Sequence, residues 1–185
     1  YFRDITRSIL KECRSLLQEA APKSEALTPN KPKAPMDKSK VFIVHGHDEA
    51  ARLAVARFVE NLGFEAIILH EQASAGNTII EKIEANSNVG FGIVLYTPCD
   101  LGRSREEEDP LKPRARQNVV FEHGYLIGKI GRENVCALVK GNIETPTDIS
   151  GVVYINMDES EAWKYQVAKE MKACGYKFDP SKLLE

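Results

Sequence analysis

The chain lacks several features that would place it in a familiar class of protein. Its 185 residues contain no apolar run near the roughly 18 residues of a membrane-spanning helix, and its N-terminus has no charged-then-apolar signal pattern. No block of like charge suggests a nucleic-acid tail, and 25 Lys and Arg residues nearly balance 27 Asp and Glu residues. These absences disfavour a membrane anchor in this segment and nucleic acid as a partner.

The cysteines show no metal-binding or disulfide spacing. Cys13, Cys99, Cys136 and Cys174 are far apart and form no C-x-x-C pair, which fits a reduced, cytoplasmic protein. The G-x-x-x-x-G-K-[ST] pattern of a P-loop is also missing, which disfavours ATP hydrolysis. We expect no metal and no bound cofactor. The first residue is Tyr1 rather than Met, which is compatible with a segment of a longer protein but does not decide it.

The residues that are present suffice for one domain with an appendage. Hydrophobic residues make up 43% of the sequence, which can furnish a core. Residues 1–20 have Ile and Leu near one helical face and predict an amphipathic helix. Residues 21–39 are rich in Pro and Lys and predict a linker. The folded domain is predicted to span residues 40–185.

Short apolar runs alternate with helical patterns throughout this domain. The apolar runs, predicted as strands, cover residues 40–46, 64–70, 89–98, 134–141 and 151–157. The stretches with helical spacing cover residues 48–63, 77–87, 114–129 and 159–175. This alternation predicts an α/β fold with a mostly parallel, doubly wound sheet of five strands and helices on both faces.

Ligands of such sheets bind beyond the carboxyl ends of the strands, where candidate binding residues gather. The glycine in "VHGHDEAA" allows a ligand to approach the backbone, and the following helix N-terminus suits phosphate. A plain turn with Asp48 as helix cap explains the same residues, and both interpretations stay open. The two His of "HGH" lack a convincing third ligand for a metal. The candidate substrate-binding residues are His45, Gly46, His47, Asp48, Ser74, Gly76, Asn77, Asp100 and Asn118.

Two loops after the strands differ in character. The segment "HEQASAGN", residues 70–77, is small, polar and glycine-containing, and such loops can rearrange over a ligand or serve as plain connectors. The segment "DLGRSREEEDPLKPRARQN", residues 100–118, has dense charge of both signs. That composition predicts a solvated, mobile loop around Glu106, Glu107 and Glu108.

A carboxylate interrupts the apolar pattern of the helix predicted over residues 114–129. Glu122 follows Phe121 and precedes His123, in surroundings where an ionised carboxylate is rarely left without a purpose or a partner. One interpretation is a helix-surface position paired with Arg114, Arg116 or Lys129. The other is a carboxylate beside a ligand cleft that stabilises a developing positive charge on a sugar. Spacing alone does not decide between them.

Three stretches together resemble a known family. "KVFIVHGHDE", "QASAGNTIIEKIE" and "RARQNVVFEHGYLIGKIGR" are similar to the TIR-like domain of bacterial antiphage effectors, which includes the TIR domains of bacterial STING and of Pycsar systems. The resemblance covers about residues 40–175. It implies a flavodoxin-like five-stranded TIR domain that cleaves NAD+ between nicotinamide and ribose. NAD+ is then a substrate rather than a cofactor.

The resemblance also implies roles for particular residues and partners. Glu122 matches the catalytic glutamate of the family, residues 45–48 its substrate-side turn, and residues 74–77 its mobile loop. His123 departs from the pattern, since relatives tend to have a neutral residue there. Self-association is expected to switch the activity on, and a sensor domain for a cyclic nucleotide is a possible partner in the full-length protein. The resemblance does not cover the N-terminal helix and linker.

Three functions remain to be compared. The first is an NAD+ glycohydrolase that releases nicotinamide and either ADP-ribose or a cyclic form. The second is a nucleotide-binding or assembly module without catalysis, because TIR folds also serve as interaction domains. The third is an enzyme similar to nucleoside deoxyribosyltransferases, which would share the glycosidic-bond chemistry.

Overall fold

The computed structural model of the chain describes residues 36–68, 81, 84–85, 88–106, 110–146 and 151–183. Within them, a five-stranded sheet has the order β2-β1-β3-β6-β7. Its strands are β1 (Lys40–Val44), β2 (Glu65–Ile68), β3 (Phe91–Tyr96), β6 (Val135–Val139) and β7 (Val153–Asn156). Every pairing between these strands is parallel, so the predicted parallel α/β sheet is confirmed.

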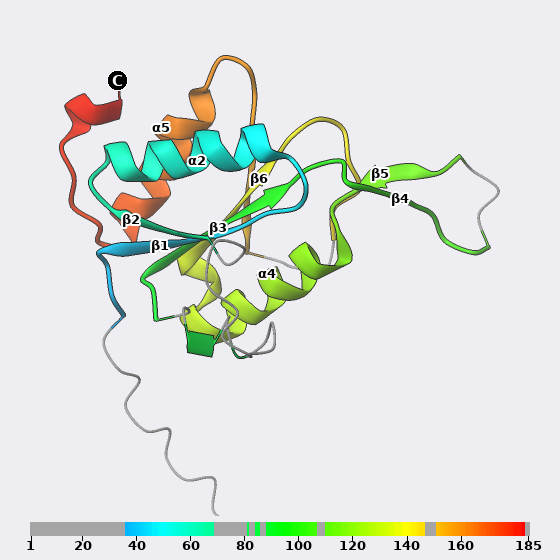
Figure 1. Cartoon of the computed structure of the whole chain (residues 1–185), viewed down its shortest axis with the longest axis horizontal. Helices are drawn as coiled ribbons and strands as arrows, with labels where there is room; N and C mark the ends of the chain where they lie inside the picture. Colours follow the sequence, from blue (N-terminus) through cyan, green and yellow to red (C-terminus); the bar gives the residue numbers. More distant parts are fainter. Residues whose placement is uncertain are drawn as a thin grey trace, which may run out of the picture. The chain divides into compact units, whose positions relative to one another are not determined.

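Helices cover both faces of this sheet, as predicted. α2 (Glu49–Asn61) and α5 (Ala162–Ala173) lie on one face, and α4 (Gln117–Ile130) lies on the other (Figure 1). Because side chains alternate along a strand, Val41 and Ile43 of β1 pack with α2 and α5, whereas Phe42 and Val44 pack with α4. The apolar, non-alternating sequence of β1 therefore reflects burial on both faces.

β3 occupies the centre of the sheet and carries the candidate site at its end. All six of its residues are buried, and it pairs with β1 on one side and β6 on the other. The carboxyl ends of these three central strands consequently lie side by side. Two short 3₁₀ helices complete the described part, at Arg132–Asn134 before β6 and at Pro180–Leu183 near the C-terminus.

Some predicted elements lie wholly or partly outside the described residues. The N-terminal helix and almost all of the linker do so, and the division into residues 1–20, 21–39 and 40–185 therefore stays a prediction. Of the helix predicted over residues 77–87, only residues 81, 84 and 85 are described, and all three are helical. The predicted helices at 48–63, 114–129 and 159–175 correspond to α2, α4 and α5.

The charged segment of residues 100–118, which was expected to be a loop, contains two short strands. β4 (Asp100–Gly102) and β5 (Lys112–Arg114) pair antiparallel as a hairpin that extends away from the main sheet (Figure 1). A Cβ at Gly102 would collide with the guanidinium of Arg114, so the Arg114 side chain covers the glycine. The hairpin is held by backbone pairing and by the contact between Arg114 and Gly102. Its sequence lacks the alternation of apolar and polar residues that would have predicted two strands. Glu106 is exposed, as predicted, and residues 107–109 lie outside the described part.

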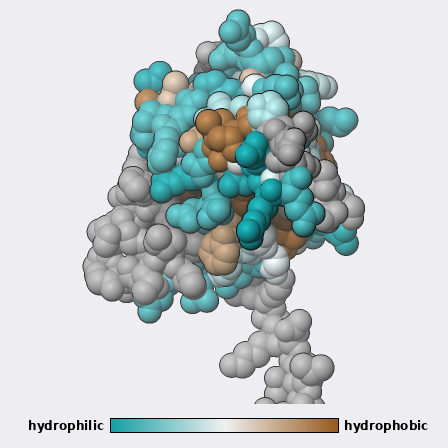
Figure 2. Space-filling view, turned by 90° about the vertical axis from the view of Figure 1, so that its right-hand side faces the viewer, coloured by the Kyte–Doolittle hydropathy of each residue, from teal (hydrophilic) through white to brown (hydrophobic). Residues whose placement is uncertain are grey.

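The hairpin exposes two leucines. Leu101 is 61% exposed and Leu111 is 53% exposed. Figure 2 views the molecule from the side to which the hairpin extends and shows separate hydrophobic patches among mostly hydrophilic side chains. Patches of this kind are frequent on protein surfaces and do not by themselves identify an interface.

Candidate functional site

The loop after β1 is in direct contact with the end of β3. A Cβ at Gly46 would lie only 2.5 Å from the Cys99 sulfur, so no larger residue fits there without a shift of that thiol. The Cys99 Sγ also accepts a hydrogen bond from the His47 N–H at 3.2 Å. The glycine is therefore needed for the approach of Cys99, whatever its role toward a ligand. His45, which precedes it, is half-buried, and its Nδ1 lies 2.7 Å from the Gly46 carbonyl oxygen.

Asp48 has both carboxylate oxygens engaged. Its Oδ1 accepts the Ala51 N–H at 2.9 Å as the N-cap of α2, and its Oδ2 lies 2.7 Å from the Lys140 Nζ. Partial burial opposes the charge, but the hydrogen bonds from Lys140 and Ala51 together keep the pKa of Asp48 below its ordinary value. Since Lys140 directly follows β6, Asp48 joins the ends of two strands. Its capping role is confirmed, and a substrate-binding role stays a prediction.

His47 connects the β1 loop to the start of α4. Its ring Nε2 is hydrogen-bonded to the Arg116 guanidinium at 2.5 Å, and both side chains are exposed. Because a guanidinium can only donate, the imidazole Nε2 accepts this bond. Arg116 is the N-cap residue of α4 and makes no side-chain cap of its own. A cationic side chain and an open helix N-terminus therefore lie beside His47.

Glu122 lies in the second turn of the same helix, about 9 Å along the helix axis from Arg116 at the usual rise per residue. The side chain is half-buried, and burial raises the pKa of its carboxyl group to about 7. No residue in the described part of the chain forms a hydrogen bond or ion pair with this carboxylate. The pairing with Arg114, Arg116 or Lys129 that one interpretation required is not found there.

His123 is fully buried on the inner face of α4. Its Nδ1 is hydrogen-bonded to the Tyr96 hydroxyl at 2.9 Å, and burial lowers its pKa to about 4. The imidazole is therefore neutral near physiological pH. It does not act on Glu122 as a charge, although the two residues are neighbours in the chain.

The other predicted site residues are distributed more widely. Asp100 begins β4, is half-buried, and stands opposite Arg114 in the hairpin. Asn118 is exposed in the first turn of α4. Ser74, Gly76 and Asn77 lie outside the described residues. The structure thus brings together the loop after β1, the end of β3 and the start of α4, and all of these assignments as binding residues stay predictions.

Three contributors to this region were missed as site residues. Cys99, Arg116 and Lys140 all contact the loop after β1 through bonds that span 52 to 92 positions of sequence. Cys99 follows a predicted strand, Lys140 lies near the end of another, and Arg116 lies in the first turn of a predicted helix, so position along the chain was an available signal. Their partners were not predictable, because the contacts depend on how the strand ends meet in three dimensions.

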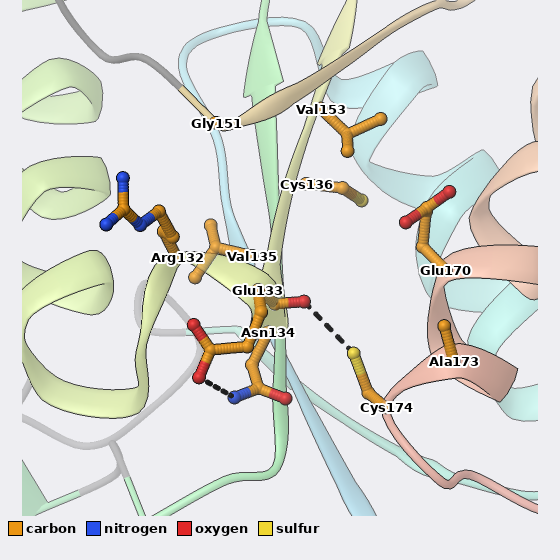
Figure 3. Close-up of a pocket in the computed structure, with 10 residues that line it drawn as sticks. All are labelled: Arg132, Glu133, Asn134, Val135, Cys136, Gly151, Val153, Glu170, Ala173 and Cys174. Atoms are coloured by element: carbon orange, nitrogen blue, oxygen red, sulfur yellow. Dashed lines mark hydrogen bonds between the residues drawn. The ribbon is translucent and has the colours of Figure 1, made fainter.

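A cavity of about 330 Å³ lies elsewhere, at the amino ends of β6 and β7 beside the C-terminal end of α5. Figure 3 shows its lining, with the Arg132 side chain turned away from Glu170 and a hydrogen bond from the Cys174 thiol to the Glu133 carbonyl oxygen. None of the predicted site residues lines it. Its position at the amino ends of the strands separates it from the region described above.

The described residues contain neither a metal-binding cluster nor a membrane-spanning helix. No group of three or more His, Cys, Asp or Glu side chains there is arranged to hold a metal ion. Among the helices of the described part, none is long and apolar enough to cross a membrane. Cys99, Cys136 and Cys174 are free thiols.

The sheet order, the helices on both faces and the polar residues at the carboxyl ends of β1 and β3 define a flavodoxin-like α/β domain. Residues 40–159 match the family described as CAP12/Pycsar effector protein, TIR domain. Since this match covers more than half of the chain, the protein belongs to that family. The predicted resemblance to effector TIR domains is thereby confirmed.

Proteins from three different organisms are similar in sequence to this chain. An Escherichia coli (strain K12) protein named YuaY and described as uncharacterized is 49% identical over 146 residues, which cover 78% of this chain and 48% of YuaY. Protein tirC of Dictyostelium discoideum is 42% identical over 133 residues, 66% of each chain. CD-NTase-associated protein 12 of Niabella drilacis is 26% identical over 68% of this chain and 41% of its own length. The chain therefore spans about two fifths to two thirds of these relatives.

Proposed function

We propose that this TIR domain is an NAD+ glycohydrolase that acts in the cytoplasm in defence against phage, and that Glu122 is its catalytic residue. The observation that carries the proposal is the half-buried Glu122 carboxylate, which has no ionic or hydrogen-bond partner among the described residues. A carboxylate that only stabilised the fold would be expected to have such a partner. The membership of the family adds support, because many TIR domains cleave NAD+.

The reaction requires little covalent chemistry from the protein. The bond between ribose C1′ and the nicotinamide nitrogen breaks, and its electron pair leaves with the nitrogen, which loses its positive charge. The ribose then carries an oxocarbenium-like charge, which an ionised carboxylate stabilises electrostatically. Water adds to C1′ and releases a proton, giving ADP-ribose. An attack by an adenine nitrogen instead of water would give a cyclic product.

The region beside Glu122 suits the remainder of the substrate. The Arg116 guanidinium and the open N-terminus of α4 offer positive potential to the pyrophosphate of NAD+. His47 has to exchange its bond with Arg116 for one to the substrate, whereas Asp48 keeps the loop in place through Ala51 and Lys140. Asp100, Asn118 and the 74–77 loop remain further candidates for contacts with the ribose and nicotinamide.

Regulation by assembly belongs to the same proposal. The family is named for effector proteins, and the chain spans less than two thirds of its relatives. We propose that a sensor domain for a cyclic nucleotide in the full-length protein clusters TIR domains, and that contact between neighbours switches on NAD+ cleavage.

The experiment that tests this function follows nicotinamide release from NAD+ by the purified protein at several protein concentrations. Release that increases with assembly supports an NAD+ glycohydrolase. Binding of NAD+ without any release, even at high concentration, would favour the non-catalytic module. Deoxynucleosides in place of NAD+ test the deoxyribosyltransferase alternative, since base release from them alone would contradict the proposal.

A further inference from the structure

A column of aromatic side chains, two of them fully buried and one half-buried, runs beneath the part of α4 that carries Glu122. His123 of α4 and Tyr96 of β3 are both 0% exposed, and their ring centroids lie 5.6 Å apart. The Tyr96 ring is 6.0 Å from that of Tyr154 on β7, which lies 6.5 Å from the ring of His123. All these ring pairs meet edge to face, an arrangement that favours attraction between aromatic rings.

Hydrogen bonds give this column a defined position. The Tyr96 hydroxyl is bonded to His123 Nδ1 at 2.9 Å, and the Tyr154 hydroxyl donates to the Pro146 carbonyl oxygen at 3.3 Å. Tyr96 and Tyr154 are fixed on strands of the sheet, whereas His123 belongs to the helix. The bond between Tyr96 and His123 therefore anchors the helix to the sheet at one specific point, which apolar packing alone would not do.

Other functions for His123 do not fit its surroundings. With no exposed surface it does not reach a substrate, and its lowered pKa makes it a poor proton carrier near neutral pH. Among the described residues, burial is the cause of both the raised pKa of Glu122 and the lowered pKa of His123, so neither shift indicates a charge interaction between the two side chains. His123 Nε2 has no partner among the described residues, which leaves the bond to Tyr96 as the polar contact that fixes the ring.

We propose that His123 is a positioning residue for Glu122, and that its hydrogen bond to Tyr96 sets the placement and partial burial of the Glu122 carboxylate. Because the two residues are adjacent on one helix, a shift of His123 moves Glu122 with it. A misplacement of about 1 Å can cost about a hundredfold in rate. The expected effect on catalysis rests on the proposed function. The placement of the Glu122 carboxylate by His123 does not depend on it.

The test removes single hydroxyl groups at two matched places. Tyr96→Phe deletes the bond to His123 and the contact of the same hydroxyl with Tyr154. Tyr176→Phe deletes another buried hydroxyl, which donates to the Lys40 carbonyl oxygen at 2.8 Å, at the amino end of β1. His123→Leu breaks the same bond from the helix side. Two quantities are measured: NAD+ turnover, and the pKa of Glu122 by carbon-13 NMR titration of its carboxyl group.

We expect Tyr96→Phe to lower kcat by about tenfold to a hundredfold with little change in KM, and to move the Glu122 pKa from about 7 toward its ordinary value of 4.5 as the carboxyl becomes hydrated. Tyr176→Phe should change neither quantity. If both tyrosine variants lower stability alike and leave the Glu122 pKa in place, the positioning role is refuted. If the wild-type protein does not cleave NAD+, the proposed function fails, and the pKa readout still decides the role of His123.

Discussion

The chemistry proposed for this domain depends on one side chain, the carboxylate of Glu122. We expect Glu122→Gln to keep the fold, because the two side chains are nearly isosteric, and to reduce NAD+ cleavage by about a hundredfold or more. Nicotinamide release measures this loss. Glu60→Gln, at an exposed position of α2, is the matched control and should retain activity. Near-native turnover by Glu122→Gln would remove this residue from the mechanism.

The raised pKa of Glu122 predicts a pH dependence of the rate. Only the ionised carboxylate stabilises a positive charge, and burial raises its pKa to about 7. The value of kcat/KM should therefore rise with pH up to about 7 and level off above it. A pH profile of nicotinamide release tests this expectation. A rate that is already constant well below pH 7 would show that the carboxylate ionises normally or is not required.

The same pKa predicts how stability depends on pH. The folded-state pKa of about 7 exceeds the ordinary glutamate value of 4.5, so the folded protein binds this proton more tightly than the unfolded chain. The free energy of unfolding should fall as the pH rises between these two values, by at most about 3 kcal/mol and by less to the extent that solvent screens the partly exposed carboxyl group. Glu122→Gln should thus be more stable than wild type above pH 7 but not below pH 4.5. Denaturant unfolding at both pH values measures the difference, and an equal effect at both would contradict it.

At the scale of helices and strands, the apolar elements were predictable and the polar hairpin was not. β1, β3 and β6 are buried on both faces, so their short apolar runs identify them without any alternation. β4 and β5 contain charged residues and Pro113, which argue against strands in general. Their pairing is held by the backbone and by Arg114 covering Gly102, a contact that periodicity cannot reveal.

In the candidate site, contacts between residues close in sequence were predictable, whereas contacts between residues far apart in sequence were not. Asp48 was predictable as an N-cap, because its partner Ala51 is three residues away. Its bond to Lys140 joins residues 92 positions apart, and Gly46 is required by the thiol of Cys99 in the segment between β3 and β4. The inward direction of His123 and the bond to Tyr96 likewise follow from the docking of α4 on the sheet. The sequence thus predicts the chemical groups of this region better than their partners.

Two glycines predict opposite effects of one substitution. Gly128 lies within α4 with open space around the position of a Cβ. Gly128→Ala should therefore stabilise the protein by about 0.5–1 kcal/mol, because alanine lowers the conformational entropy of the unfolded chain. A Cβ at Gly46 would meet the Cys99 sulfur, so Gly46→Ala should destabilise the loop after β1. Urea unfolding measures both changes. The same sign for both variants would contradict the packing described around Gly46.

At the scale of the whole molecule, the carboxyl edge of the sheet is open to solvent. His47, Arg116 and Asn118 are all exposed in this region, and Glu122 is only half-buried. A carboxylate stabilises an oxocarbenium-like charge far better where water is excluded. The described residues at this edge offer little that could cover a dinucleotide, so under the proposed function we expect a neighbouring subunit to complete the enclosure.

A site that is open to solvent predicts that activity depends on assembly. It also predicts that a catalytically inactive subunit can increase the activity of an active neighbour. Specific activity should rise steeply with protein concentration, because neighbours exclude water from the site. Glu122→Gln protein keeps its surfaces, so an excess of it added to dilute wild-type protein should increase nicotinamide release, whereas an equal mass of an unrelated protein should not. Light scattering on the same samples reports the assembly. If release per wild-type subunit stays constant across concentrations and mixtures while the protein remains a monomer, the site is complete within one chain.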